Sequence, residues 1–134
     1  MTIQYDSAPE SSEPGEQECE RIAVYGTLKR GYRNHQLLMR ARFLGTDHLS
    51  TIVLHDLGPC PGAVERPSAG VLVEVYEVDE RTFARVDALE GYNPQAPEHG
   101  DYTRRRMATR FGPAWVYFYN GSVRGCRRIT RGAW

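Results

Sequence analysis

Valines at every second position mark the strongest predicted strand of this chain, in residues 70–78: Val71, Val73 and Val75. They share one face of an extended segment, because successive side chains of a strand point to opposite sides. A second apolar run, residues 22–25, ends at Gly26 and is typical of a short buried strand. Both segments are therefore predicted to be strands, and residues 22–25 are predicted to be buried.

Weaker patterns cover the residues between these two strands. Asn34 is a candidate N-cap for a short helical turn, and residues 41–54 are predicted to be extended, with a break at Gly45. Residues 55–62 contain two glycines and two prolines, so this segment is predicted to be a loop.

One amphipathic helix is predicted over residues 80–90. Asp79 is a good N-cap, Val78 is placed to pack against Phe83 as a hydrophobic staple, and Gly91 supplies a stop signal. The helix therefore ends at Glu90, directly before the glycine.

A hairpin is predicted near the carboxyl end, because residues 102–111 and 114–119 flank the dipeptide Gly112-Pro113. The second arm is densely aromatic, which favours a strand. Together the segments give five to six strands and one good helix. The fold class predicted from them is α+β, a curled sheet or small mixed β-barrel with flanking helices.

Composition and charge fit a single globular domain of 134 residues whose two ends differ in charge. Residues 1–19 are rich in Glu, Ser and Pro, and we predict a disordered acidic leader there. The domain proper is predicted over residues 20–122. Residues 123–134 form a basic segment for which three readings stand: it binds RNA or phosphate, it packs on the acidic leader, or it stays solvated.

Several classes of function are disfavoured by what the chain contains. Its three cysteines, Cys19, Cys60 and Cys126, are widely spaced, so neither a disulfide framework nor a metal site is expected. The formal net charge is zero, so no global field attracts nucleic acid. No apolar run approaches the roughly 20 residues that span a bilayer, and no signal peptide is visible, so we expect a cytoplasmic protein.

The turn after the first strand is a candidate anion site. Gly26 follows Tyr25 and lets the backbone turn its N–H groups toward a bound carboxylate without a side chain in the way. The amides of Gly26, Thr27 and Leu28 are the predicted donors.

Glu90 is the candidate acid–base group. It lies within about 60° of Phe83 and Val86 around the helix, so it shares the apolar stripe. Burial and the negative end of the helix dipole both favour the protonated carboxyl and predict a raised pKa. An alternative remains: the last turn frays, and Glu90 meets water or an arginine such as Arg104.

The order of motifs resembles the gamma-glutamylcyclotransferase superfamily, specifically the gamma-glutamylamine cyclotransferase and AIG2-like branch. The resemblance covers roughly residues 21–119. Its motifs are, in order, Tyr25-Gly26-Thr27-Leu28-Lys29-Arg30-Gly31, Asn34-His35, Pro61-Gly62, Val86-Asp87-Ala88-Leu89-Glu90-Gly91-Tyr92, and Tyr102 with Arg104 and Arg105.

This resemblance implies a mixed barrel and a cyclotransferase that converts a γ-glutamyl amine to 5-oxoproline and a free amine, without metal or other cofactor. It implies that Glu90 is the proton acceptor and that the loop from Tyr25 to Leu28 holds the glutamyl end. The partner is then a small γ-glutamyl molecule. The identity of the released amine and the oligomeric state stay open.

Other assignments keep two alternatives each. The donor to the developing oxyanion is either a backbone N–H or the hydroxyl of Tyr117 or Tyr119, which are otherwise packing residues. Residues 104–106, all arginines, form either a solvated edge or a pocket rim, and residues 93–101 form either a lid or a surface loop. A non-catalytic module that binds a small carboxylate or an acidic partner is the alternative function.

Overall fold

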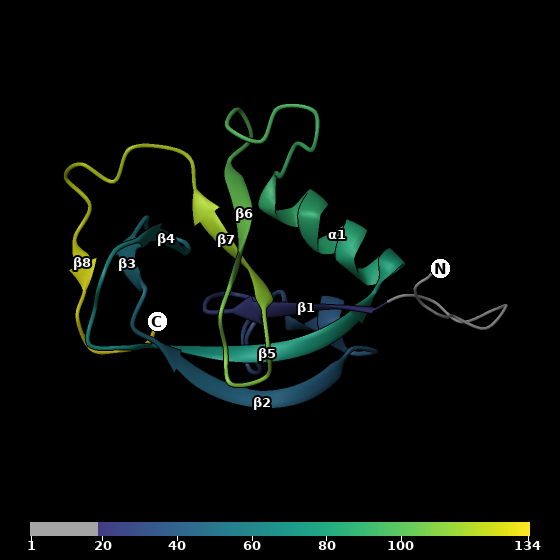
Figure 1. The fold of residues 1–134 in the computed structure, drawn as a ribbon. Helices are drawn as coiled ribbons and strands as arrows, with labels where there is room; N and C mark the ends of the chain where they lie inside the picture. The colour runs from purple at the N-terminus through teal and green to yellow at the C-terminus, as the bar shows by residue number, and fades with distance from the viewer. Residues whose placement is uncertain (1–18) are drawn as a thin grey trace, which may run out of the picture.

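The computed structural model describes residues 19–134, which form eight strands, one α-helix and one short 3-10 helix (Figure 1). The elements in chain order are β1 (Cys19–Val24), η1 (His35–Leu38), β2 (Arg42–Leu49), β3 (Ile52–Asp56), β4 (Pro61–Glu65), β5 (Val71–Asp79), α1 (Glu80–Glu90), β6 (Tyr102–Met107), β7 (Ala114–Tyr119) and β8 (Arg128–Ile129). The predicted leader lies outside the described residues except for Cys19, which begins β1.

The strands form two sheets that do not close into a barrel. Five strands form one sheet in the order β2-β5-β1-β7-β6, and three form another in the order β4-β3-β8. Among the strand pairs of residues 19–134, β1 and β7 are parallel and all the others are antiparallel. In Figure 1, β2 and β5 curve along the bottom of the molecule, while β3, β4 and β8 lie at the left. The predicted barrel is therefore wrong for residues 19–134, because β2 and β6 stay at the edges of the larger sheet.

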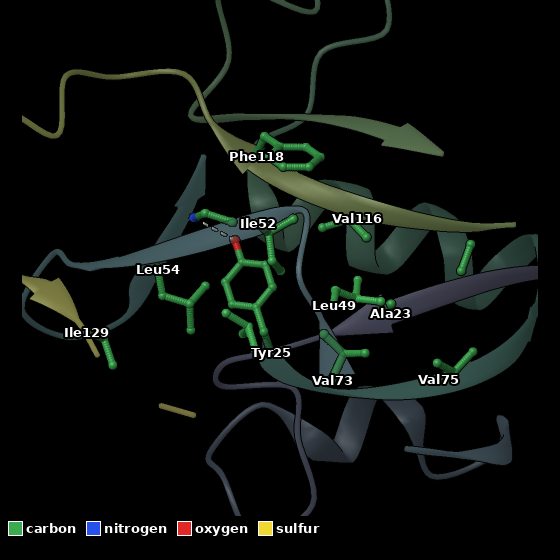
Figure 2. Close-up of a cluster of buried hydrophobic side chains, with 13 residues drawn as sticks. Ala23, Tyr25, Leu49, Ile52, Leu54, Val73, Val75, Val116, Phe118 and Ile129 are labelled. Atoms are coloured by element: carbon green, nitrogen blue, oxygen red, sulfur yellow. Dashed lines mark hydrogen bonds between the residues drawn. The ribbon is translucent and has the colours of Figure 1, made fainter. Parts of the chain in front are cut away.

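The strongest predicted strand is confirmed as β5, which lies between β2 and β1. Val71, Val73 and Val75 are buried on one face, as the alternation predicts. Tyr76 and Val78 on the other face are buried as well, because core side chains cover both faces of this strand. Figure 2 shows the cluster on the valine side, which includes side chains from both sheets.

The segment between the first strand and β5 differs from the prediction. Residues 42–56 form two strands joined by a tight turn, with a β-bulge between Phe43 and Gly45 where the break was predicted. The predicted loop 55–62 is wrong at both ends: β3 continues to Asp56, and β4 begins at Pro61. Proline is tolerated there because it is the first residue of an edge strand.

Two further differences lie toward the carboxyl end. The predicted hairpin forms, but its first strand, β6, ends at Met107 rather than at residue 111. The strand β8 was not predicted; Ile129 pairs with Leu54 of β3 and is buried. The sequence offers only a weak signal for this strand, because Ile129 is a single apolar residue in a segment rich in arginine. The division of the chain at residue 122 stays a prediction.

The helix α1 is confirmed at both ends. The Asp79 carboxylate accepts a hydrogen bond from the backbone N–H of Thr82 at 2.8 Å, and Gly91 adopts the left-handed conformation, with φ 69°. Val86 is buried in the core on the Tyr76 side of the large sheet, and Phe83 packs against that core. Because the helix ends at Glu90 and Gly91 caps it, Glu90 has a defined place in the last helical turn.

Candidate active site

A cavity of about 180 Å³ opens where segments distant in the chain meet. Its wall is formed by the turn 25–28, the residues before η1, the start of β4, the end of α1, and two tyrosines, Tyr102 and Tyr117. Binding pockets for drug-sized ligands span about 300–1,000 Å³. This cavity therefore suits a molecule of the size of an amino-acid derivative.

The turn after β1 presents three amides without partners in residues 19–134. The backbone N–H groups of Gly26, Thr27 and Leu28 donate no hydrogen bond there, and all three residues line the cavity. The carbonyl groups of the same turn are all engaged. The Gly26 carbonyl accepts from the Lys29 amide, the Thr27 carbonyl from the Asn34 amide, and the Leu28 carbonyl from Nδ1 of His35.

Amides without an acceptor beside a cavity are donors that suit a carboxylate, so the turn is a candidate anion site. Asn34, which also lines the cavity, donates from its side chain to Oγ1 of Thr27 at 2.9 Å and so fixes the turn. The neighbouring residues anchor it further, since the Arg30 amide donates to the buried Glu74 carboxylate at 2.9 Å.

The requirement for glycine at position 26 has a different cause from the predicted one. Gly26 is not among the glycines with positive φ. A Cβ atom at this position would lie 2.9 Å from Cγ of Pro61, closer than real Cβ contacts allow. Glycine is therefore needed because β4 packs directly against the turn, and this close approach forms one wall of the cavity.

Glu90 lines the same cavity, from the end of α1. Its carboxylate is partly buried and has no hydrogen bond or ion pair with any residue in the range 19–134. Burial, and then the nearby Asp87 carboxylate, raise the pKa of Glu90 from 4.5 to about 7. A carboxyl that is half ionised near neutral pH is suited to accept and return a proton.

Arg104 contacts Asp87 instead of Glu90. Its guanidinium donates to both Asp87 oxygens, at 2.9 and 3.2 Å, and the Tyr117 hydroxyl donates to one of them at 2.5 Å. The same guanidinium lies over the rings of Phe83, Tyr92 and Trp115. The predicted alternative of an Arg104–Glu90 pair is therefore wrong, and the Glu90 carboxylate stays available to a ligand.

The two following arginines differ from Arg104. Arg105 pairs with Glu65 and Arg106 with Glu20, and both pairs are largely exposed. The solvated edge predicted for residues 104–106 is therefore formed by Arg105 and Arg106 only. Arg104 instead links β6 to the last turn of α1 through its partly buried ion pair with Asp87.

The three tyrosines of the cavity all have their hydroxyl protons engaged. Tyr25 donates to the Tyr117 carbonyl at 2.7 Å and accepts from the Ala63 amide, a contact drawn as a dashed line in Figure 2. Tyr102 donates to the Pro61 carbonyl at 2.9 Å, and Tyr117 donates to Asp87. Burial is the main cause that raises the pKa of each of these tyrosines. The hydroxyls therefore remain protonated and hold the cavity wall together.

The structure brings together most, but not all, of the residues predicted from the sequence. Tyr25, Gly26, Thr27, Leu28, Glu90 and Tyr117 line the cavity. Tyr119 does not; its ring packs against Tyr102, with 5.4 Å between centroids. None of the residues 93–101 lines the cavity either, so the predicted lid has no contact with it in this structure.

Five polar residues near the cavity were not predicted as site residues. Arg33, Asn34, Cys60 and Tyr102 line it, and Asp87 lies behind it, bonded to Tyr117. Asp87 had a usable signal, since it precedes Glu90 by three residues and so lies on the same helix face. The others meet the cavity only through long-range packing.

Residues 19–134 contain no group of three or more His, Cys, Asp or Glu side chains placed to hold a metal ion. In the same range no helix has the length and apolar character needed to cross a membrane. No disulfide joins the three cysteines.

Comparison with known proteins shows to which family the chain belongs. Residues 22–134 match the family described as "Gamma-glutamyl cyclotransferase, AIG2-like". The chain belongs to this family. It is 36% identical over 115 residues to the gamma-glutamylcyclotransferase family protein YtfP of Escherichia coli K12, covering 85% of this chain and 95% of YtfP.

Solved structures of family members have the same fold. The crystal structure of protein PH0828 from Pyrococcus horikoshii is 34% identical, covers 85% of this chain and 88% of its own, and superposes with a TM-score of 0.69. The crystal structure of a mouse AIG2-like protein gives a TM-score of 0.70 at 24% identity, covering 87% of this chain and 88% of its own. The likeness to the mouse protein concerns the fold alone.

Proposed function

We propose that this protein cyclises a small γ-glutamyl amine to 5-oxoproline and releases the free amine, with Glu90 as general acid and base. The observation that carries the proposal is the pairing, in one cavity, of a carboxyl group and three backbone amides that have no hydrogen-bond partner within residues 19–134. Membership of the gamma-glutamyl cyclotransferase family supports the γ-glutamyl part of this proposal.

The amides of the turn 26–28 hold the α-carboxylate of the glutamyl group. This contact folds the flexible chain so that the α-nitrogen lies over the γ-carbonyl carbon. Orientation of this kind contributes up to about 7–11 kcal/mol in well-aligned intramolecular reactions. The small cavity favours the folded form, because an extended glutamyl chain needs more length.

Proton transfer is the task of Glu90. The ionised carboxylate takes a proton from the α-ammonium, whose nitrogen then attacks the carbonyl and forms the carbon–nitrogen bond of the five-membered ring. The second proton leaves this nitrogen as the bond to the departing amine breaks. Both protons end on the released nitrogen, delivered through Glu90. No oxidant, metal or external nucleophile enters this balance.

The developing oxyanion requires a donor, and a backbone amide of the turn is the better candidate. The hydroxyl protons of Tyr25, Tyr102 and Tyr117 already bind acceptors of the protein. Tyr119 lies outside the cavity lining. An amide among residues 26–28 that does not hold the α-carboxylate has no competing acceptor in residues 19–134.

The test is to incubate the purified full-length protein with γ-glutamyl-alanine and to measure 5-oxoproline and alanine by chromatography. We expect equal amounts of both products, and a loss of at least a hundredfold in Glu90→Gln. The control Glu80→Gln makes the same chemical change at the exposed first turn of α1 and keeps full activity. Wild-type rates in the Glu90→Gln protein would remove Glu90 from the mechanism.

The alternative function is a binding module that uses the same amides to hold a small carboxylate but catalyses no reaction. A carboxylate-binding module needs the turn 26–28 but not Glu90. It predicts that γ-glutamyl-alanine raises the melting temperature while no 5-oxoproline forms, and that Glu90→Gln leaves this shift unchanged.

A further inference from the structure

Lys29 carries a buried ammonium group directly after the amide turn. Only 4% of this residue is exposed, and its Nζ donates a hydrogen bond to the main-chain oxygen of Trp134 at 2.8 Å. Within residues 19–134 the ammonium forms no ion pair with a side-chain carboxylate and has no other hydrogen-bond acceptor. Burial lowers the pKa of Lys29, and Glu74 opposes this shift. The contact with Trp134 therefore compensates the ammonium for the water that it loses.

Trp134 is itself fixed in place. The Tyr32 hydroxyl donates to the same main-chain oxygen at 3.0 Å, and the centroids of the Tyr32 and Trp134 rings lie 5.2 Å apart. The Trp134 side chain packs against the core on the valine side of β5. The Gly132 carbonyl accepts a hydrogen bond from the Leu72 amide at 2.8 Å, at the start of β5 (Figure 1). Lys29, Tyr32 and Trp134 therefore form a contact, called the clasp below, between the large sheet and the amide turn.

The clasp lies at one end of the amide turn, and β4 lies at the other. The Lys29 amide donates to the Gly26 carbonyl at 3.0 Å, which closes the turn. On the opposite side, Pro61 packs so closely against Gly26 that a Cβ atom has no room there. None of the three clasp residues lines the cavity. A change in the clasp therefore reaches the cavity only through the turn.

We propose that Lys29 is a positioning residue, which uses its bond to Trp134 to hold the amides of residues 26–28 where they bind the substrate carboxylate. This inference rests on one part of the proposed function, the carboxylate-binding turn. It gives the end of the basic segment a role at a site that it does not touch. Without this anchor the turn samples several conformations, and the apparent affinity falls with the fraction that is competent to bind. The reaction of the bound substrate then changes little.

The experiment separates positioning from stability. Lys29→Met keeps the apolar stem of the side chain and removes the donor, whereas Lys29→Arg keeps a charged donor. Tyr32→Phe removes the second donor to the Trp134 oxygen. The control Ile52→Val trims a buried residue of β3 that does not line the cavity, so it lowers the melting temperature and leaves the hydrogen bonds of the clasp in place.

Each protein is assayed for KM and kcat with γ-glutamyl-alanine and for its melting temperature. The dissociation constant of 5-oxoproline, which carries the carboxylate that the amides hold, is measured by titration calorimetry. We expect Lys29→Met to raise KM and this dissociation constant about tenfold, with kcat within about twofold of wild type. Lys29→Arg stays closer to wild type than Lys29→Met does.

The other two variants show that the effect is not one of stability. Tyr32→Phe raises KM and the dissociation constant about twofold although its melting temperature hardly changes. Ile52→Val melts at a lower temperature and keeps the wild-type KM.

A wild-type KM in folded Lys29→Met overturns the inference. A rise in KM that Ile52→Val shares also overturns it, because a loss of stability then suffices. If Lys29→Met does not fold, Tyr32→Phe decides, and an unchanged dissociation constant in that variant overturns the inference. If wild type binds 5-oxoproline but forms none, the proposed reaction fails while the dissociation constants still decide on the clasp. Wild type that neither binds nor forms 5-oxoproline overturns both.

Discussion

Replacing Glu90 by glutamine makes the protein more stable above neutral pH, and by an amount that depends on pH. The unfolded chain ionises this carboxyl at its ordinary pKa of 4.5, whereas the folded protein does so at about 7. The folded state therefore holds the proton more tightly. Stability due to this group is complete below pH 4.5 and is lost as the pH rises through 7.

The magnitude follows from the size of the shift. At 1.36 kcal/mol per pKa unit, a shift from 4.5 to about 7 lowers the wild-type free energy of unfolding by about 3 kcal/mol at pH 8. Glutamine does not ionise, and Glu90 has no protein partner in residues 19–134 whose contact would be lost. For a chain of this length, 3 kcal/mol is roughly 10 °C in melting temperature.

The assay is thermal and urea unfolding of wild type and Glu90→Gln at pH 4.5, 6, 7 and 8. We expect the two proteins to be nearly equal at the lowest pH and to diverge steadily up to pH 8. The control Glu80→Gln removes a carboxylate from the favourable end of the helix dipole, so it is less stable than wild type by about 0.3–1 kcal/mol. A Glu90→Gln difference that stays constant across this range would refute the claim that the carboxylate is ionised at a cost in the cavity.

Three further predictions concern the cavity wall. Gly26→Ala places a Cβ atom 2.9 Å from Cγ of Pro61 and lowers the unfolding free energy by about 1–3 kcal/mol, and the added change Pro61→Ala recovers part of the loss in urea unfolding. Tyr25→Phe removes the hydroxyl that binds the Tyr117 carbonyl and the Ala63 amide, and it lowers the unfolding free energy by about 1–3 kcal/mol. Tyr32→Phe removes an exposed hydrogen bond and lowers the unfolding free energy by less than about 0.5 kcal/mol. Equal effects of the two changes would contradict this prediction. Arg104→Met breaks a partly buried pair with Asp87 and costs about 2–3 kcal/mol, against about 0–1 kcal/mol for Arg105→Met at the exposed Glu65 pair, as judged from urea midpoints.

Local signals explain the parts of the fold that the sequence predicts correctly. The alternating valines of β5 are a local pattern, since every second residue of a short segment predicts which face of the strand is buried. The caps of α1 are equally local, since Asp79 bonds Thr82 and Gly91 ends the last turn. The position of Glu90 follows from those two caps and the helical period, whereas its role as candidate proton acceptor is implied by the family resemblance.

Long-range pairing explains what the sequence left out. The start of β4 reads as a loop because Pro61 and Gly62 have low strand propensity, yet pairing with β3 fixes them. The strand β8 depends on two residues that pair with β3 across the chain. The alternative contact between Arg104 and Glu90 is wrong for a similar reason: two carboxylates lie on one helix face, and packing decides that Asp87 receives the guanidinium.

The pH dependence of kcat/KM for 5-oxoproline release tests the central claim most directly. Since the ionised form of Glu90 accepts the first proton, the rate should rise with pH through an apparent pKa of about 7 and then level off. The residual rate of Glu90→Gln should lack this rise. A wild-type rate that is flat from pH 5 to 8, or a rise near 7 that persists in Glu90→Gln, would contradict the account.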